Sequence, residues 1–143
     1  MTGIYDEHGI RFEHPADWDV EITEEGSAAT VAIQAPSGLA FTLVTVDDTC
    51  PPPAEVADEA LAAMREEYPT LEAVPALESI AGHNAPGYDV EFISLDMTNT
   101  CAIRCFRTPR RTILVFGQWS DLDADENAAH FDDVKRSLQE TDG

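Results

Sequence analysis

Basic residues are scarce in this sequence. Its 143 residues include 8 lysines and arginines against 28 aspartates and glutamates, which gives a formal net charge of −20, and Lys135 is the single lysine. A field of this sign repels the phosphates of nucleic acids and the headgroups of anionic lipids, which proteins bind by neutralising their charge. We therefore expect neither nucleic acid nor a membrane surface as a partner.

Long apolar segments are lacking as well. No stretch approaches the roughly 20 apolar residues that a bilayer-spanning helix needs. The N-terminal residues MTGIYDEHG contain neither a basic segment nor the apolar region of a secretion signal. These absences lead us to expect a cytoplasmic location.

Cysteine is too scarce for a disulfide framework, since Cys50, Cys101 and Cys105 are odd in number. Cys101 and Cys105 fall in one predicted strand, where four residues span about 13 Å, roughly twice the Cα separation that a disulfide tolerates. A pairing with Cys50 remains open, but free buried thiols suit a reducing cytoplasm better. Arg104 could lower the pKa of the Cys105 thiol, yet strand alternation places that thiol on the apolar face. We expect a core thiol.

The sequence has no motif of catalysis or metal binding. The four histidines, His8, His14, His83 and His130, are far apart and lack the HxH, HExxH or Cys-His spacing of metal sites. It has no GxSxG segment and no glycine-rich loop that could hold a phosphate. We assign no catalytic residue, no metal and no cofactor, and leave open whether the protein is an enzyme, with a non-enzyme favoured.

One acidic segment, DLDADENAAHFD at residues 121–132, superficially resembles a calcium-binding loop. Its sixth position holds Glu126 where such a loop needs glycine, and its twelfth holds Asp132 where a bidentate glutamate belongs. Asp123 and Glu126 instead have the spacing of a helix capping box. We expect a helix start here and no calcium site.

The residues that are present predict a single domain over residues 1–143, since 43% of them are apolar and the length suits one core. Alternating apolar residues predict three or four strands in the first third of the chain, two of them joined by a turn at APSG. The prolines of CPPP then start an amphipathic helix. Its buried stripe is made of Ala57, Leu61, Met64 and Tyr68.

About four antiparallel strands and a C-terminal helix complete the predicted order. In the last strand, TILVFGQW, Ile113, Val115 and Trp119 face one way, while Leu114 and Phe116 face the other. Neither face can be left in water, so we expect a central strand that is covered on both faces. The closing helix buries a stripe made of Ala128, Phe131, Val134 and Leu138.

This order of elements resembles that of the PsbP-like superfamily. The resemblance includes FEHPADW at an early strand corner and IAGHNAPGYDVEF after the first helix. It implies an α+β fold, an α/β/α sandwich around a mainly antiparallel sheet in the order β-β-β-(β)-α-β-β-β-β-α. It also implies a family of mostly non-catalytic binding or assembly proteins with no shared active-site motif, so no catalytic residue is carried over.

His14 lies in the first of these motifs, between a glutamate and a proline. Pro15 favours an extended conformation at His14 and ends the strand, and Trp18 is large enough to bury its ring beneath the corner. We interpret RFEHPADWDV as a structural corner rather than a site.

Half of the basic residues gather in RCFRTPRR. For Arg104 we favour internal charge compensation over a docking role. If the preceding hairpin turns at Met97 and Thr98, Arg104 lies opposite Glu91 and forms a cross-strand pair. The other three arginines, Arg107, Arg110 and Arg111, could receive an acidic peptide or an anionic ligand at the turn tip.

Two functions follow from these observations. The first is a non-enzymatic binding or adaptor domain that engages a protein partner through the arginine-bearing hairpin or a sheet cleft. The alternative is a small enzyme or ligand-binding protein with a pocket between sheet and helix, walled by His83, Tyr88 and Trp119. We expect a monomer or a weak dimer.

The strong acidity has two explanations that differ in salt dependence. Solubility in a salty cytoplasm implies that charge repulsion opposes folding, so the free energy of unfolding should rise as added salt screens it. Docking to a basic partner makes no such demand. Denaturant unfolding at increasing sodium chloride concentrations measures this dependence, and a flat or falling free energy would contradict the adaptation to salt.

Overall fold

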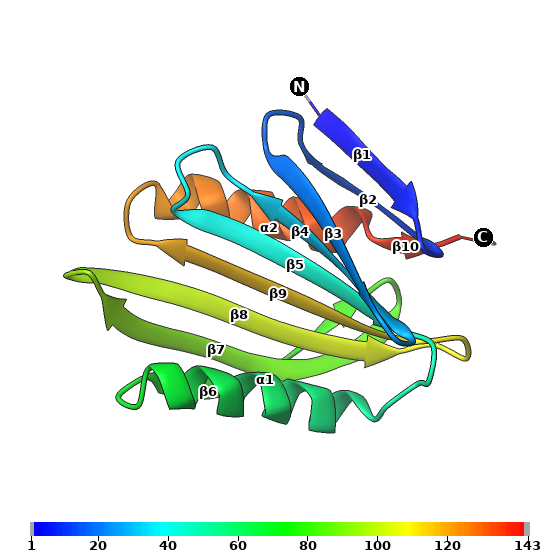
Figure 1. Cartoon of the computed structure of the whole chain (residues 1–143). Coiled ribbons are helices and arrows are strands. Elements are labelled where there is room, and N and C mark those ends of the chain that lie inside the picture. Colours follow the sequence, from blue (N-terminus) through cyan, green and yellow to red (C-terminus); the bar gives the residue numbers. More distant parts are fainter. Residues whose placement is uncertain (1, 142–143) are drawn as a thin grey trace.

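Most of the chain is arranged in antiparallel strands (Figure 1). The structure is a computed structural model, and it describes residues 2–141. Its larger sheet has seven strands in the order β3-β4-β5-β9-β8-β7-β6. These strands are β3 Asp19–Glu25, β4 Ala28–Gln34, β5 Ala40–Asp47, β6 Glu72–Ile80, β7 His83–Ser94, β8 Met97–Arg107 and β9 Thr112–Ser120.

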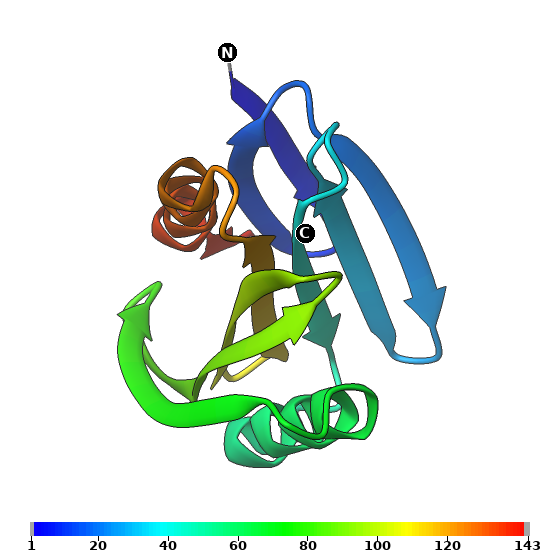
Figure 2. The same cartoon turned by 90° about the vertical axis from the view of Figure 1, so that its left-hand side faces the viewer.

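A smaller sheet and two helices cover this large sheet. The small sheet contains β1 Thr2–Glu7, β2 Ile10–Pro15 and the two-residue β10 Gln139–Glu140. Helix α1, Pro53–Glu67, packs on β7, β8 and β9, while α2, Ala124–Ser137, packs on β9 and β2. Figure 2 shows the two helices on opposite sides of the curved sheet. The predicted α/β/α sandwich around an antiparallel sheet is confirmed.

Strand β9 is the fourth of the seven strands and is bonded to β5 and β8. Ile113 and Val115 belong to the core under α2, whereas Leu114 and Phe116 pack into the core under α1. The prediction of a central strand covered on both faces is confirmed. Its cause is visible in the sequence, because a strand with apolar residues at consecutive positions must bury both faces.

The helices follow their predicted apolar stripes. Pro53 occupies the first turn of α1, where its missing amide hydrogen costs no helical bond, and Ala57, Leu61 and Met64 are buried. The capping box predicted for α2 is wrong: Asp123 adopts a left-handed conformation with φ 56° and makes no side-chain cap. Neither helix of the described chain is long and apolar enough to span a membrane.

Hairpin turns precede and follow β7, and the second of them differs from the prediction. The β7–β8 turn lies at Leu95 and Asp96, which both have positive φ, 53° and 61°, and not at Met97 and Thr98. This pair carries no glycine, so the usual sequence signal of a two-residue turn is missing. The turn before β7 lies at Ala81 and Gly82, which both have positive φ, and β7 begins at His83.

The position of the β7–β8 turn sets the register of both strands. Val90 lies opposite Cys101, and Arg104 lies opposite Gly87, so the pairing predicted between Arg104 and Glu91 is wrong. A Cβ atom on Gly87 would overlap the carbonyl of Ile103 on β8. A side chain at position 87 is therefore incompatible with this close approach of the strands.

The packing of α2 on β9 depends on a second glycine, Gly117. A Cβ atom there would collide with the ring of Phe131, which is 2% exposed. We expect Gly117→Ala to lower the free energy of unfolding by about 1–3 kcal/mol, because the helix must move away from the sheet. In a Phe131→Leu background the same change should cost less, since the smaller side chain leaves room. Urea unfolding of the four proteins measures this coupling, and equal costs in both backgrounds would refute it.

Candidate functional site

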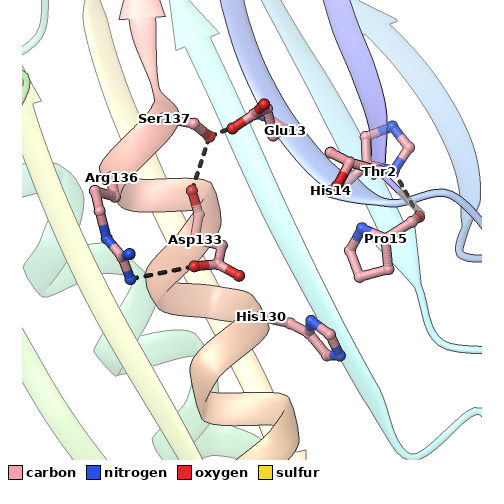
Figure 3. A pocket seen from close by; sticks show the side chains of 8 residues that line it. All are labelled: Thr2, Glu13, His14, Pro15, His130, Asp133, Arg136 and Ser137. Carbon is pink, nitrogen blue, oxygen red and sulfur yellow. Dashed lines mark hydrogen bonds and ion pairs between the residues drawn. The ribbon is translucent and has the colours of Figure 1, made fainter.

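A cleft of about 480 Å³ separates β2 from α2 (Figure 3). Figure 3 shows His14 on the β2 wall and His130 on the α2 wall. The cleft is formed because β2 is paired with β10 only at Ile10 and Arg11, which leaves its outer edge open farther along. Its lining combines polar and apolar surface and consists of Thr2, Glu13, His14, Pro15, His130, Asp133, Arg136 and Ser137.

The β2 wall is the corner predicted from FEHPADW. His14 is buried, its Nδ1 donates to the Pro15 carbonyl oxygen over 2.9 Å, and its ring occupies the space that a side chain on Gly3 would need. The amide of Trp18 donates to the same carbonyl over 3.1 Å. Trp18 is buried and meets the ring of His130 edge-on, with 5.4 Å between the centroids. The corner is therefore structural, and it also forms one wall of the cleft.

The α2 wall is held by bonds among its own residues. The Arg136 guanidinium lies 3.1 Å from the Asp133 carboxylate, and the Arg136 side chain is 74% exposed. The Ser137 hydroxyl donates to the Asp133 carbonyl oxygen over 2.7 Å and accepts from the Glu13 amide over 2.8 Å. The cleft thus offers imidazole, guanidinium and carboxylate groups to a small polar ligand.

A second hollow, of about 470 Å³, lies on the large sheet where α2 does not cover it. The residues at the bottom of this hollow are brought together by the strand register, in which Glu72 is opposite Glu91 and Thr100 is opposite Trp119. Glu91 is itself opposite Thr100, so one row of side chains crosses four strands. We call this surface the open face, and it comprises Glu72, Val74, Asp89, Glu91, Ile93, Thr100 and Trp119.

The open face combines aliphatic side chains with carboxylates. Val74 is 63% exposed and Ile93 is 74% exposed, whereas Trp119 is half-buried against Phe131 of α2, with 5.6 Å between ring centroids. The opposition of Glu72 and Glu91 across two strands is unfavourable, because like charges at directly paired positions repel. An exposed apolar surface with a like-charge pair is the kind of surface that a partner can stabilise.

An ion-pair network closes the covered end of this face. Arg104, only 7% exposed, donates to Glu78 over 2.6 Å and to Asp89 over 2.8 Å, while Lys135 of α2 donates to Glu78 over 2.9 Å. Burial alone would raise the pKa of Glu78, but the bonds and charges of Lys135 and Arg104 outweigh it and hold that pKa below its usual value. Arg104 is therefore compensated internally, by Glu78 and Asp89 instead of Glu91.

The other arginines of RCFRTPRR do not form one exposed group. Arg107 and Arg110 are exposed and donate to the carbonyl oxygens of Cys50 and Thr141, over 3.3 and 3.2 Å. Arg111 is 8% exposed, and it donates to Glu140 and to the Gly9 carbonyl oxygen, each over 2.9 Å. The expected tip position of Arg111 is thus corrected: it ties β9 to the β1–β2 turn and to β10, and only Arg107 and Arg110 present charge to solvent.

The three side chains expected to wall one pocket lie in three places. Tyr88 points to the α1 side and donates to Asp58 over 2.5 Å. His83 stacks on Phe106, with 5.6 Å between centroids, in a hollow of about 390 Å³ beside β10. Trp119 belongs to the open face. The prediction that these residues wall a common pocket is therefore wrong. Alternation along β7 puts Tyr88 and His83 on opposite faces of the sheet.

Sequence reasoning missed the open face. Of its members, only Trp119 was singled out, because an aromatic residue with a polar tip is a common wall of binding sites. Val74 and Glu72 can be assigned to this surface only when the register of β6 against β7 is known, and that register depends on the turn at Ala81 and Gly82. The glycine of this turn is the signal that could have found it.

The described residues contain no arrangement suited to metal chemistry and no exposed reactive thiol in the sheet. No group of three or more histidine, cysteine, aspartate or glutamate side chains within residues 2–141 could hold a metal ion. Cys101 and Cys105 are free and fully buried, and burial raises the pKa of both thiols, that of Cys105 to about 12. Both thiols are therefore protonated at neutral pH.

Solved structures show that this chain has a PsbP-like fold. CyanoP, the cyanobacterial PsbP of Synechocystis sp. PCC 6803, is similar over 98% of this chain and 92% of its own, with a TM-score of 0.69 and 11% identity. LpqN of Mycobacterium tuberculosis, described as involved in cell envelope biogenesis, is similar over 99% of this chain and 91% of its own, with a TM-score of 0.63 and 12% identity. Identities this low establish the fold and leave the function open.

Sequence comparisons add nothing to this similarity. No protein-family model matches the chain, and no curated protein sequence matches it. The resemblance of FEHPADW and IAGHNAPGYDVEF to the PsbP-like superfamily is thus supported at the level of the fold.

The burial of the cysteines makes their reactivity predictable. In the folded protein, half-buried Cys50 should react with a thiol reagent such as DTNB promptly, whereas Cys101 and Cys105 should react only as fast as the protein opens. Absorbance at 412 nm should show that one thiol reacts rapidly in the folded protein and that all three react in guanidinium chloride. Prompt release from three thiols without denaturant would contradict the buried placement.

Proposed function

We propose that this protein is a non-enzymatic binding module that engages a partner protein through the open face. The observation that carries the proposal is the exposure of Val74 and Ile93 beside Trp119, on the side of the sheet that α2 covers only in part. Apolar surface left on an ordered scaffold and rimmed by polar groups is typical of sites where proteins meet.

The titratable groups support binding over catalysis. The lowered pKa of Asp47 comes from bonds to Thr49, and the lowered pKa of Glu78 comes from its two cationic partners against the effect of burial. The pKa of Tyr5 is raised to about 12, first by burial and then by Glu7 and Glu24. Each shift has a structural cause, whereas a catalytic site gathers shifted groups around one cleft.

The arginine-bearing hairpin is a weaker surface for the same role. Arg107 and Arg110 already donate to carbonyl oxygens, and Glu140 lies beside them in its pair with Arg111. We retain the two exposed arginines as an alternative contact. A cytoplasmic location and a monomeric or weakly dimeric state remain part of the proposal, since a net charge of −20 opposes self-association.

The β2–α2 cleft supports a second candidate function, the binding of a small polar ligand. Its size and the two imidazoles on opposite walls favour this function. If the cleft has this function, the ligand should copurify with the protein. Native mass spectrometry should then detect the ligand bound to the wild-type protein and not to a His130→Ala variant.

Affinity capture with variants tests the main proposal. The wild-type protein, immobilised and exposed to native lysate at two salt concentrations, should retain a protein that Val74→Ser/Ile93→Ser retains about tenfold less, because the apolar contacts are lost. Leu77→Ser is the matched control, since Leu77 is 69% exposed on the same edge strand but on the other face. Arg107→Glu/Arg110→Glu tests the hairpin.

The outcomes separate the candidates. Retention that depends on Val74 and Ile93 but not on Leu77 supports the open face, and it should be reproduced with the purified partner. If the partner is lost only with the Arg107→Glu/Arg110→Glu variant, the binding site lies at the hairpin instead of the open face. If no protein is retained and native mass spectrometry shows a small molecule that requires His130, the ligand-binding function replaces the proposal.

A further inference from the structure

We infer that the partner presents a basic amphipathic helix, which packs on the open face beside α2. This inference rests on the proposed function and adds the chemistry of the partner. It is argued from three properties of the open face: the missing part of a helical layer, the exposed aliphatic side chains and the charge of the row between them.

On the α2 side, the sheet lacks helical cover at its β6 end. Helix α1 covers β7, β8 and β9 on its side, whereas α2 packs mainly on β9 and β2. At β6, α2 meets the C-terminal end of the strand, where Lys135 pairs with Glu78 and Ile80 belongs to the core under α2. In Figure 2 the outer strands of the sheet curve around the space next to α2. Layered domains bury a sheet face under helices, so a helix from a partner would complete the layer.

The size of the open face suits such a helix. Along β7 it extends from Asp89 to Ile93, which corresponds to about 13 Å of strand. Roughly nine helical residues span the same length. Across the strands, the face is bounded by the free edge of β6 and by Trp119, which leans on Phe131 of α2.

The charge of the open face selects a basic helix. Glu72, Asp89 and Glu91 all point to this side of the sheet, and the basic side chain that reaches it, Arg104, pairs with Asp89 from the covered end. Glu72 and Glu91 face each other, and within residues 2–141 neither of them forms an ion pair. A lysine or arginine placed between them would offset their repulsion.

The same arrangement predicts the pattern of the partner helix. Aliphatic side chains would cover Val74 and Ile93, which lie on either side of the row of glutamates. A basic side chain near this row could also lie over the indole of Trp119, since cations are attracted to aromatic faces. A second copy of this chain does not provide this pattern, because its own open face carries the same negative charge.

Designed helical peptides test this inference. The probe is a fluorescein-labelled 18-residue leucine–lysine peptide with leucines on one face, and its binding is followed by anisotropy in 150 mM salt. Two matched peptides replace leucine by serine or lysine by glutamate. We expect the leucine–lysine peptide to bind at least about tenfold more tightly than either one, because both contacts are required.

Protein variants locate the peptide. Glu72→Gln/Glu91→Gln and Val74→Ser should each weaken binding of the leucine–lysine peptide by about tenfold. Glu59→Gln/Glu66→Gln removes the same charge from exposed positions of α1 and should change binding less than about twofold, as should Leu77→Ser. Circular dichroism establishes that each variant is folded.

Several results would overturn the inference. Equal weakening by the Glu72/Glu91 and Glu59/Glu66 variants would mean that only net charge attracts the peptide. Equal affinity of the serine peptide, or binding unaffected by Val74→Ser, would remove the apolar contact. Concentration-dependent dimers abolished by Val74→Ser would assign the face to a second copy. In each of these cases a partner mapped to Val74 and Ile93 by capture would leave the proposed function intact.

Discussion

The burial of both faces of β9 is the constraint on which the rest of the structure depends. Ile113 and Val115 on one face and Leu114 and Phe116 on the other leave no side that water could cover at low cost. The strand must therefore lie in the middle of the sheet and receive a helix on each side. Gly117 lets α2 come close, because the ring of Phe131 fills the space of a side chain.

A helix centred on β9 cannot also cover the far strands on its side. The apolar stripe of α2 packs mainly on β9 and β2. Helix α2 meets β6 at the C-terminal end of that strand, where Lys135 pairs with Glu78 and Ile80 is buried in the same core. Arg104 continues this network to Asp89, so the covered end of the face is closed by charged groups that satisfy each other. The open face begins where this network ends, and its exposure is a consequence of the topology.

Sequence patterns predicted those parts of the fold in which local and tertiary preferences agree. The consecutive apolar residues of β9 and the stripe of Ala57, Leu61 and Met64 on α1 were sufficient to place both elements. The β7–β8 turn was not predictable, since Leu95 and Asp96 take positive φ without a glycine. That error changed the register and with it the partner of Arg104. The candidate site depends on such registers, so Trp119 is the one member of the open face that the sequence identified as a candidate binding residue.

Acidity alone does not account for the open face. Solubility explains carboxylates on the outer sides of helices, where they meet water, but it gives no reason to leave Val74 and Ile93 in water between them. An edge strand protected against aggregation would likewise carry charge without exposed aliphatic neighbours. Glu72 and Glu91 at directly paired positions cost stability that a different residue at either position would restore. Apolar exposure and like-charge pairing on neighbouring rows of one sheet face have one common physical explanation, a partner that supplies both apolar cover and positive charge.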